Sequence, residues 1–112
     1  MPKVEVYYVD WKPRCLGSIY RIVADELGCD VDDIIQVPRE RPGTNNDVLR
    51  LTVWVTASPR STNQHKMAEQ IRSRIDKLCA VVGILHKVSV IVDYRDLGLA
   101  LYDPERDETE RK

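Results

Sequence analysis

The sequence predicts an α+β domain in which two strand-helix-strand units follow each other and form one four-stranded mixed sheet with two helices on one face. Three observations predict it. Apolar residues alternate or cluster in four short segments typical of strands, they recur at helical spacing in two longer segments, and the order is strand, helix, strand, twice over. With 112 residues the chain can bury one core but cannot be divided into two. We therefore expect a single domain over residues 1–112.

The first unit spans residues 1–37. Alternating apolar residues predict a strand over about residues 3–11, which the turn-prone stretch 11–14 ends. A helix follows, because apolar residues recur at helical spacing, and Gly28 is placed to cap its C-terminus. Its stripe consists of Leu16, Ile19, Ile22, Val23 and Leu27. Three aspartates then lead to a short apolar strand over residues 34–37, which Pro38 is expected to close.

Residues 38–47 have the composition of a loop, and the second unit spans residues 48–94. Apolar and polar residues alternate from Leu49, which predicts a strand with one buried face. Ser61 is expected to open a helix, with Gln64 completing a capping box. The apolar stripe of this helix consists of Met67, Ile71, Ile75, Leu78 and Val82, Gly83 follows it, and a last strand is expected over residues 88–92. Residues 95–112 form a C-terminal extension.

Strand-helix-strand units with parallel strands are right-handed in nearly every case, so both helices are expected on the same face of the sheet. The other face is then left bare, with Tyr7, Trp54 or their neighbours on it. A bare apolar sheet face usually packs against another subunit. We therefore expect an oligomer.

Composition argues against several classes of partner. Seventeen Lys and Arg against eighteen Asp and Glu give a net charge of −1, and the basic residues form no stripe, so nucleic acid is not an expected partner. No segment has the length of a membrane span or the pattern of a signal peptide, which favours a reducing cytoplasm. Cys15, Cys29 and Cys79 are an odd number without a C-x-x-C motif, and His65 and His86 lack a second ligand at metal spacing. We expect buried structural thiols, no zinc and no other metal.

Pro2 follows the initiator and heads the first strand. If Met1 is removed, Pro2 becomes a secondary amine, which is a base when neutral and an acid when protonated. Nearby cations or a drier pocket would lower its pKa into the physiological range. A retained Met1 would acylate the nitrogen and abolish its basicity. Taken alone, a proline at this position is more simply explained as part of an ordinary chain terminus.

Three local patterns in register resemble the tautomerase superfamily, most closely its malonate semialdehyde decarboxylase branch. They are Pro2 at the start of the first strand, Asp33 followed by Arg41-Pro42-Gly43, and Pro59-Arg60-Ser61 at the entry to the second helix. The resemblance implies a fold like that of macrophage migration inhibitory factor, a homotrimer and no cofactor. It further implies that Pro2 is the general acid or base, that Asp33 assists the proton or water chemistry, and that Arg60 binds the substrate carboxylate.

The substrate-binding set implied by the resemblance departs from the decarboxylase branch in part. Ser58 stands where that branch has a second arginine, and Lys12 stands where many members have a cation near the end of the first strand. Leu99 and Leu101 make the expected pocket wall more aliphatic. A guanidinium can hold a carboxylate in two places and would also favour a neutral amine at Pro2. Without the resemblance, the aspartates near position 33 are also typical of an ordinary polar turn.

Two functions from different classes follow. The first is an enzyme without cofactor that acts on a small keto, enol or unsaturated carboxylic acid by tautomerisation, hydration, dehalogenation or decarboxylation. The alternative is a non-catalytic, ferredoxin-like oligomeric module that binds a small ligand, because the same topology serves both. A partner-binding protein that uses Trp11, Trp54 and the tyrosines is a third, less favoured reading, because these aromatic residues are more readily explained as strand residues at a subunit contact.

Overall fold

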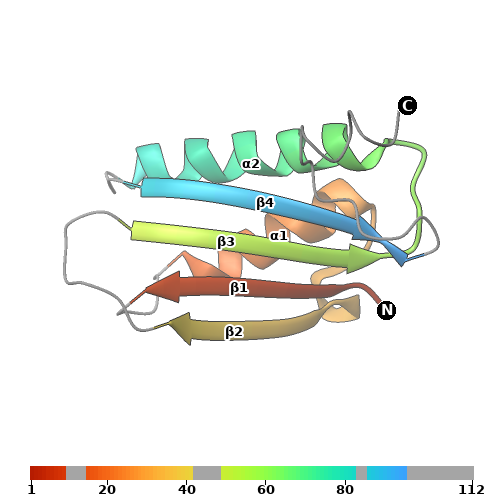
Figure 1. Ribbon diagram of the computed structural model, residues 1–112, viewed down its shortest axis with the longest axis horizontal. Coiled ribbons are helices and arrows are strands. Elements are labelled where there is room, and N and C mark those ends of the chain that lie inside the picture. Colours follow the sequence, from red (N-terminus) through yellow and green to blue (C-terminus); the bar gives the residue numbers. More distant parts are fainter. Residues whose placement is uncertain (10–14, 42–48, 83–85, 96–112) are drawn as a thin grey trace, which may run out of the picture.

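The computed structural model describes residues 1–9, 15–41, 49–82 and 86–95. Two strand-helix-strand units form one four-stranded mixed sheet with two α-helices (Figure 1), as the sequence predicts. The elements are β1 (Lys3–Val9), α1 (Leu16–Leu27), the 3₁₀-helix η1 (Val31–Asp33), β2 (Ile35–Arg41), β3 (Leu49–Ala57), α2 (Gln64–Val81) and β4 (His86–Tyr94).

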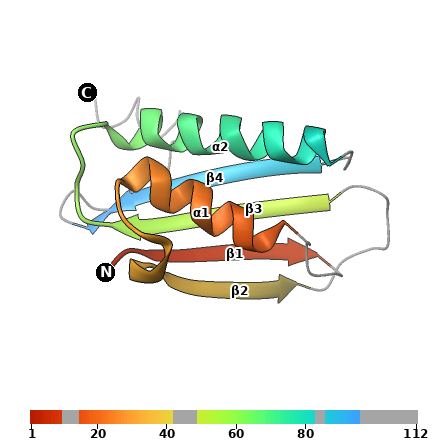
Figure 2. The ribbon, with the colours of Figure 1, turned by 180° about the vertical axis from the view of Figure 1, so that it is seen from behind.

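The strand order is β2-β1-β3-β4, with β1 parallel to β2, β3 parallel to β4 and the two central strands antiparallel. Both α-helices cover the same face of the sheet (Figure 2). The core lies between these layers. It consists of alternate residues of the strands and one stripe from each helix, and its fully buried members include Val4, Val6, Ile19, Val23, Val53, Val55, Ile71, Ile75 and Val92.

The first helix ends as the sequence predicts. Gly28 adopts a left-handed conformation with φ of 73°, which glycine adopts without a steric penalty. Its backbone N–H is directed at the carbonyls of Ala24 and Asp25. The chain therefore leaves α1 with a sharp turn toward η1 and β2.

The start of the second helix differs from the expectation. α2 begins at Gln64, and its N-cap is Asn63, whose Oδ1 accepts a hydrogen bond from the Lys66 N–H at 2.8 Å. Ser61 therefore does not open the helix, and Gln64 forms no capping box with it. The expected apolar stripe is also wrong at its end, because Cys79 is fully buried whereas Val82 is 50% exposed.

Both outer strands are longer than expected. β2 continues through Pro38 to Arg41, so residues 38–41 are not part of a loop, and the rest of the loop expected over 38–47 lies outside the described residues. Pro38 is tolerated because β2 is an edge strand. The Ile35 N–H bonds to β1, which directs position 38 toward the open edge, where no donor is needed. β4 likewise extends two residues beyond each end of the expected 88–92; Gly83 is outside the described part of the chain.

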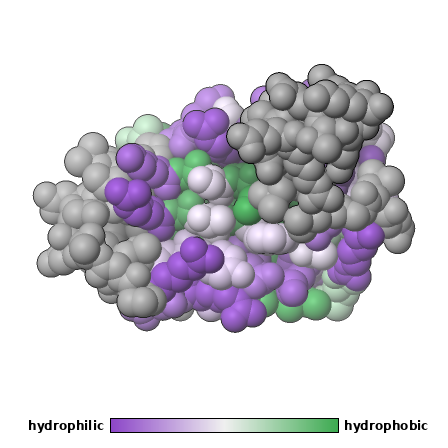
Figure 3. All heavy atoms as spheres, in the orientation of Figure 1, coloured by the Kyte–Doolittle hydropathy of each residue, from purple (hydrophilic) through white to green (hydrophobic). Residues whose placement is uncertain are grey.

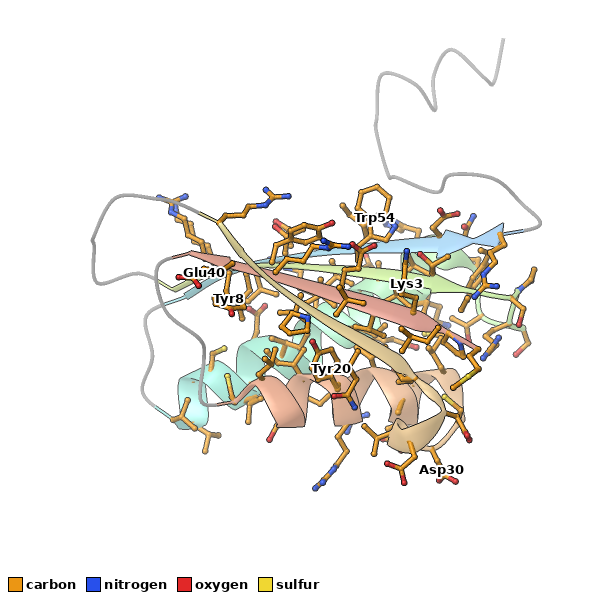
Figure 4. The ribbon with its side chains drawn as sticks, turned by 90° about the horizontal axis from the view of Figure 1, so that it is seen from below. Lys3, Tyr8, Tyr20, Asp30, Glu40 and Trp54 are labelled. Atoms are coloured by element: carbon orange, nitrogen blue, oxygen red, sulfur yellow. The ribbon has the colours of Figure 1, made fainter. Side chains whose placement is uncertain are left out.

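The face of the sheet opposite the helices is bare, as expected, and it carries Tyr7 and Trp54. Figure 4 shows Lys3 and Trp54 on the side away from the helices and Tyr20 between α1 and the sheet. The face is less apolar than the sequence suggests. In Figure 3 a small apolar area lies among hydrophilic side chains, and the register places Lys3, Glu5, Arg39, Arg50, Lys87 and Asp93 on this face.

Two of the three thiols are buried as expected. Cys15 and Cys79 belong to the core, and burial raises the pKa of both, that of Cys79 to about 11. Cys29 is only partly buried. Within the described residues, no helix combines the length and the apolar character needed to cross a membrane.

Candidate active site

The candidate site lies at the end of the sheet where the chain begins. Here β1 and β2 start and β3 and β4 end, at the right-hand end of Figure 1. The register fixes this neighbourhood, since Lys3 pairs with Thr56 and Ala57 pairs with Tyr94. We call this the amino-terminal end of the sheet, defined by Pro2, Asp33, Ser58, Arg60 and Arg95. Four of these five residues were expected in the site from the sequence.

The backbone on both sides of Pro2 is held by hydrogen bonds. The Pro2 carbonyl accepts from the Ile35 N–H at 2.8 Å, which joins it to the start of β2. The Met1 carbonyl accepts from Nη2 of Arg95 at 2.6 Å. Pro2 itself is half-buried, while Met1 is 68% exposed. With Met1 attached, the nitrogen of Pro2 is an amide and not a base.

Arg60 uses most of its donors to bind the protein. Its Nε donates to the Leu27 carbonyl at 3.1 Å, and its Nη1 donates to the carbonyl and to Oγ of Ser58, both at 2.7 Å. The Leu27 carbonyl is one of those left unpaired at the end of α1, so the guanidinium satisfies it and complements the helix dipole. Among the described residues, Nη2 of Arg60 is the guanidinium nitrogen that has no hydrogen bond to the protein, so it could serve a ligand. A carboxylate would therefore bind to this one nitrogen, in contrast to the two-point grip expected from the sequence.

Ser58, which the sequence suggested as a substrate-binding residue, contacts Arg60 in the structure. Its side-chain oxygen accepts a hydrogen bond from Arg60 and fixes the direction of the guanidinium. Serine at this position thus orients the Arg60 side chain.

Asp33 ends η1, two residues before Ile35, and its side chain is exposed. Its backbone N–H donates to the Asp30 carbonyl at 3.0 Å, which shapes the turn that leads into β2. Figure 4 shows Asp30 at this end of the molecule, next to η1. Asp33 and Arg60 both act electrostatically on Cys29, which lies between the end of α1 and η1. The structure therefore brings the two charged candidates into one neighbourhood.

Cys29 is not suited to be a nucleophile. Burial raises the pKa of its thiol; Arg60 opposes this shift, and Asp33 and Asp30 add to it. The reactive form of cysteine is the thiolate, which these surroundings disfavour. Cys29 is best understood as a partly buried residue that packs against the core.

Tyr94 holds the segment that carries Arg60. Its hydroxyl donates to the Thr62 carbonyl at 2.6 Å, and its backbone N–H donates to Oε1 of Gln64 at 2.8 Å. Burial raises the pKa of the Tyr94 hydroxyl, and Arg60 opposes this shift. These bonds tie the chain between β3 and α2 to the end of β4. Sequence reasoning missed this role, because the two segments meet only through tertiary pairing.

Three residues of the expected binding set, Lys12, Leu99 and Leu101, lie outside the described residues. The strand that precedes Lys12 ends at Val9, which is separated from Pro2 by the full length of β1, or about 20 Å. Among the described residues, no group of His, Cys, Asp or Glu side chains is arranged to hold a metal ion.

Comparison with known proteins identifies the fold. No protein-family model matches the chain, and no curated protein does. Among solved structures, FG41 malonate semialdehyde decarboxylase inhibited by 3-bromopropiolate has a TM-score of 0.55 at 9% identity, over 96% of this chain and 95% of that one. Macrophage migration inhibitory factor from Toxoplasma gondii has a TM-score of 0.51 at 10% identity, over 90% and 96%. Native fused 4-OT has a TM-score of 0.52 at 9% identity, over 80% and 85%.

These likenesses cover almost the whole of each chain, so they concern the complete domain and not a shared motif. At identities near 10% they show the fold alone and leave the activity to be argued from the site. The chain has the fold of these tautomerase-superfamily structures.

Proposed function

We propose that this protein is a cofactor-independent enzyme that uses Pro2 as general acid or base on a small keto, enol or unsaturated carboxylic acid. The observation that supports the proposal is that Pro2 is bonded to the start of β2, two residues after Asp33, while Arg60 binds the end of α1 that leads into this turn. An amine, a carboxylate and a guanidinium supply a proton carrier, a charge to assist it and a donor for the substrate.

The roles follow from the chemistry of each group. Once Met1 is removed, the neutral amine of Pro2 takes a proton from the carbon next to a carbonyl group, or from water, and returns it as an ammonium. Nη2 of Arg60 binds the carboxylate and places the reacting carbon near Pro2. The carboxylate of Asp33 stabilises protonated Pro2 or activates water. Lys12, Leu99 and Leu101 remain proposed contributors to substrate binding.

The fold of malonate semialdehyde decarboxylase and of fused 4-OT supports this class of function. The reaction type stays open among tautomerisation, hydration, dehalogenation and decarboxylation, because all of them need the same three groups. We further propose that the working form is a homotrimer that associates through the bare face of the sheet.

The first test is intact-mass spectrometry of untagged protein, followed by a screen of enol, 2-oxo and halogenated unsaturated acids. Loss of one methionine is expected. Pro2→Ala should then lower turnover by about 100-fold or more, the usual contribution of a positioned acid or base. Pro38→Ala is the matched control, because that proline lies on the exposed edge strand with its nitrogen directed away from β1. Equal turnover by P2A and P38A would contradict the proposed function.

One observation favours the non-catalytic ligand-binding module as a second candidate. The Met1 carbonyl is itself held by Arg95, and a chain that keeps Met1 has no basic nitrogen at Pro2. Retention of Met1 in protein made by its own host, together with binding of a carboxylic acid without turnover, would establish this reading.

A further inference from the structure

Arg95 extends the candidate site beyond the residues that sequence reasoning found. It directly follows β4, its side chain is exposed, and Nη2 donates to the Met1 carbonyl across a sequence separation of 94 residues. Its neighbour Tyr94 is fixed through both its hydroxyl and its backbone N–H. The backbone at Arg95 therefore directly follows a residue that hydrogen bonds hold in place.

The bond to Met1 determines how close Arg95 lies to the proposed catalytic nitrogen. In a peptide group the carbonyl oxygen lies about 2.3 Å from the nitrogen of the next residue. Because Nη2 lies 2.6 Å from the Met1 oxygen, it lies within about 5 Å of the Pro2 nitrogen, whatever the angle between the two vectors. Within the described part of the chain, Arg95 is the guanidinium that bonds to the peptide group joining Met1 and Pro2.

Removal of Met1 changes what this guanidinium can bind. Hydrolysis of the Met1–Pro2 bond consumes one water and releases methionine, and it leaves a secondary amine on Pro2. The carbonyl oxygen that Arg95 held departs with the methionine. Since Met1 is 68% exposed, its place is open to solvent and to small solutes. An oxygen of an anionic ligand could then occupy the acceptor position next to the new amine.

We propose that Arg95 is a second carboxylate-binding residue of this site, and that the removal of Met1 makes its guanidinium available. This inference rests on the proposed function for its class of substrate. It addresses a shortage noted above, because Arg60 has only Nη2 left for a ligand. Arg95 would supply a further donor for an anionic ligand beside the Pro2 amine. The additional cation would thus come from the residue that directly follows β4.

Arg95 would also influence the amine itself. A positive charge close to the amine disfavours protonation of Pro2 and so lowers the pKa of its amine. This effect requires no substrate. It therefore offers a measurement that a purely structural role for Arg95 would not change.

The test uses protein whose mass shows that Met1 is absent, with malonate as a non-reacting probe of carboxylate binding. Arg95→Gln should weaken malonate binding in calorimetry by about tenfold, the loss expected for one charged hydrogen bond. Nitrogen NMR of labelled proline should show a higher pKa for the Pro2 amine in R95Q. Arg95→Lys should restore part of both effects because it keeps the charge.

Arg72→Gln is the matched control. Arg72 lies on α2, its side chain is 60% exposed, and the substitution changes the net charge by the same amount. It should leave malonate binding and the Pro2 pKa unchanged. Malonate binding that is absent from the wild type, or equal in R95Q, R72Q and the wild type, would overturn the role of Arg95. So would retention of Met1 in all preparations.

These readouts are independent of the proposed function. If no acid is turned over but R95Q still weakens malonate binding and raises the Pro2 pKa, the enzyme proposal fails and the role of Arg95 stands. If P2A abolishes turnover but R95Q binds malonate like the wild type, the enzyme proposal stands and the role of Arg95 fails.

Discussion

At the scale of single residues, two tyrosines in the same core show how much a hydrogen bond partner matters. Tyr20 is 3% exposed, and its hydroxyl has no partner within the described part of the structure. Tyr94 is 1% exposed, and its hydroxyl donates to the Thr62 carbonyl. A buried polar group without a partner loses its hydration and gains nothing in return, whereas a paired group recovers most of that loss.

Tyr20→Phe should therefore leave the free energy of unfolding unchanged or raise it by up to about 1 kcal/mol. Tyr94→Phe, which makes the same chemical change, should lower it by about 1 kcal/mol because the Thr62 carbonyl loses its donor. Urea unfolding of the two variants beside the wild type measures both values. A larger loss in Y20F than in Y94F would contradict this account.

Tyr20 also predicts a dependence of stability on pH. Burial raises the pKa of Tyr20 to about 12, with a smaller contribution from Tyr8, whereas an unfolded tyrosine titrates near 10. Between these values the folded chain retains a proton that the unfolded chain has lost. The free energy of unfolding is therefore expected to fall as the pH rises from about 10 to 12. Urea titrations at pH 9 and pH 11 should show a smaller fall in Y20F than in the wild type.

At the scale of elements, the local sequence pattern does not determine at which residue a helix or strand begins or ends. Ser61, Thr62 and Asn63 can each cap a helix, and the sequence favoured Ser61 because Gln64 stands three residues later. In the structure Gln64 is engaged with the end of β4, so Asn63 caps α2 instead. The order of strands and helices was predictable because each element has several apolar residues at its own period. A cap is a single residue, and long-range contacts decide between neighbours.

Asn63→Ala should lower the free energy of unfolding by about 1 kcal/mol, because the Lys66 N–H loses its acceptor at the start of α2. Ser61→Ala is the control and should change it by less than about 0.5 kcal/mol, as expected for an exposed residue outside such a feature. Thermal and urea unfolding of both variants decide the matter. A greater loss of unfolding free energy in S61A than in N63A would indicate that Ser61 caps the helix, as the sequence suggested.

The composition of the candidate site also depends on long-range contacts that a local pattern does not contain. Pro2, Asp33 and Arg60 could be named because each belongs to a local motif. Arg95 could not, because only the pairing of β1 with β3 and of β3 with β4 brings it to the first residue of the chain. Pro38 was taken for a strand end, since its tolerance depends on β2 being at the edge of the sheet. Sheet order is a property of the whole fold, and no single segment contains it.

At the scale of the whole molecule, the bare sheet face determines how copies could associate. Glu5 is a largely buried charge on this face. Its side chain is 12% exposed and accepts from the Tyr7 hydroxyl at 2.8 Å and from Nε of Arg39 at 2.7 Å. Arg41 lies over the ring of Tyr7, 4.2 Å from its centroid. Burial opposes the ionisation of Glu5, but these hydrogen bonds outweigh it and lower the pKa of the carboxyl. The charge of Glu5 is thus compensated within the chain, which makes covering this part of the face with another copy less costly.

The homotrimer we propose can be tested at the centre of this face. Trp54 is half-buried there, paired in register with Glu5 and Ile91. Trp54→Glu would place an uncompensated charge between subunits, so light scattering after gel filtration should show a shift from three chains to one. Val81→Glu is the control, because Val81 lies on α2 and is 85% exposed; its mass should equal that of the wild type. A wild-type protein that runs as a monomer at micromolar concentration would contradict the trimer, and the bare face would then have to be stable in water by itself.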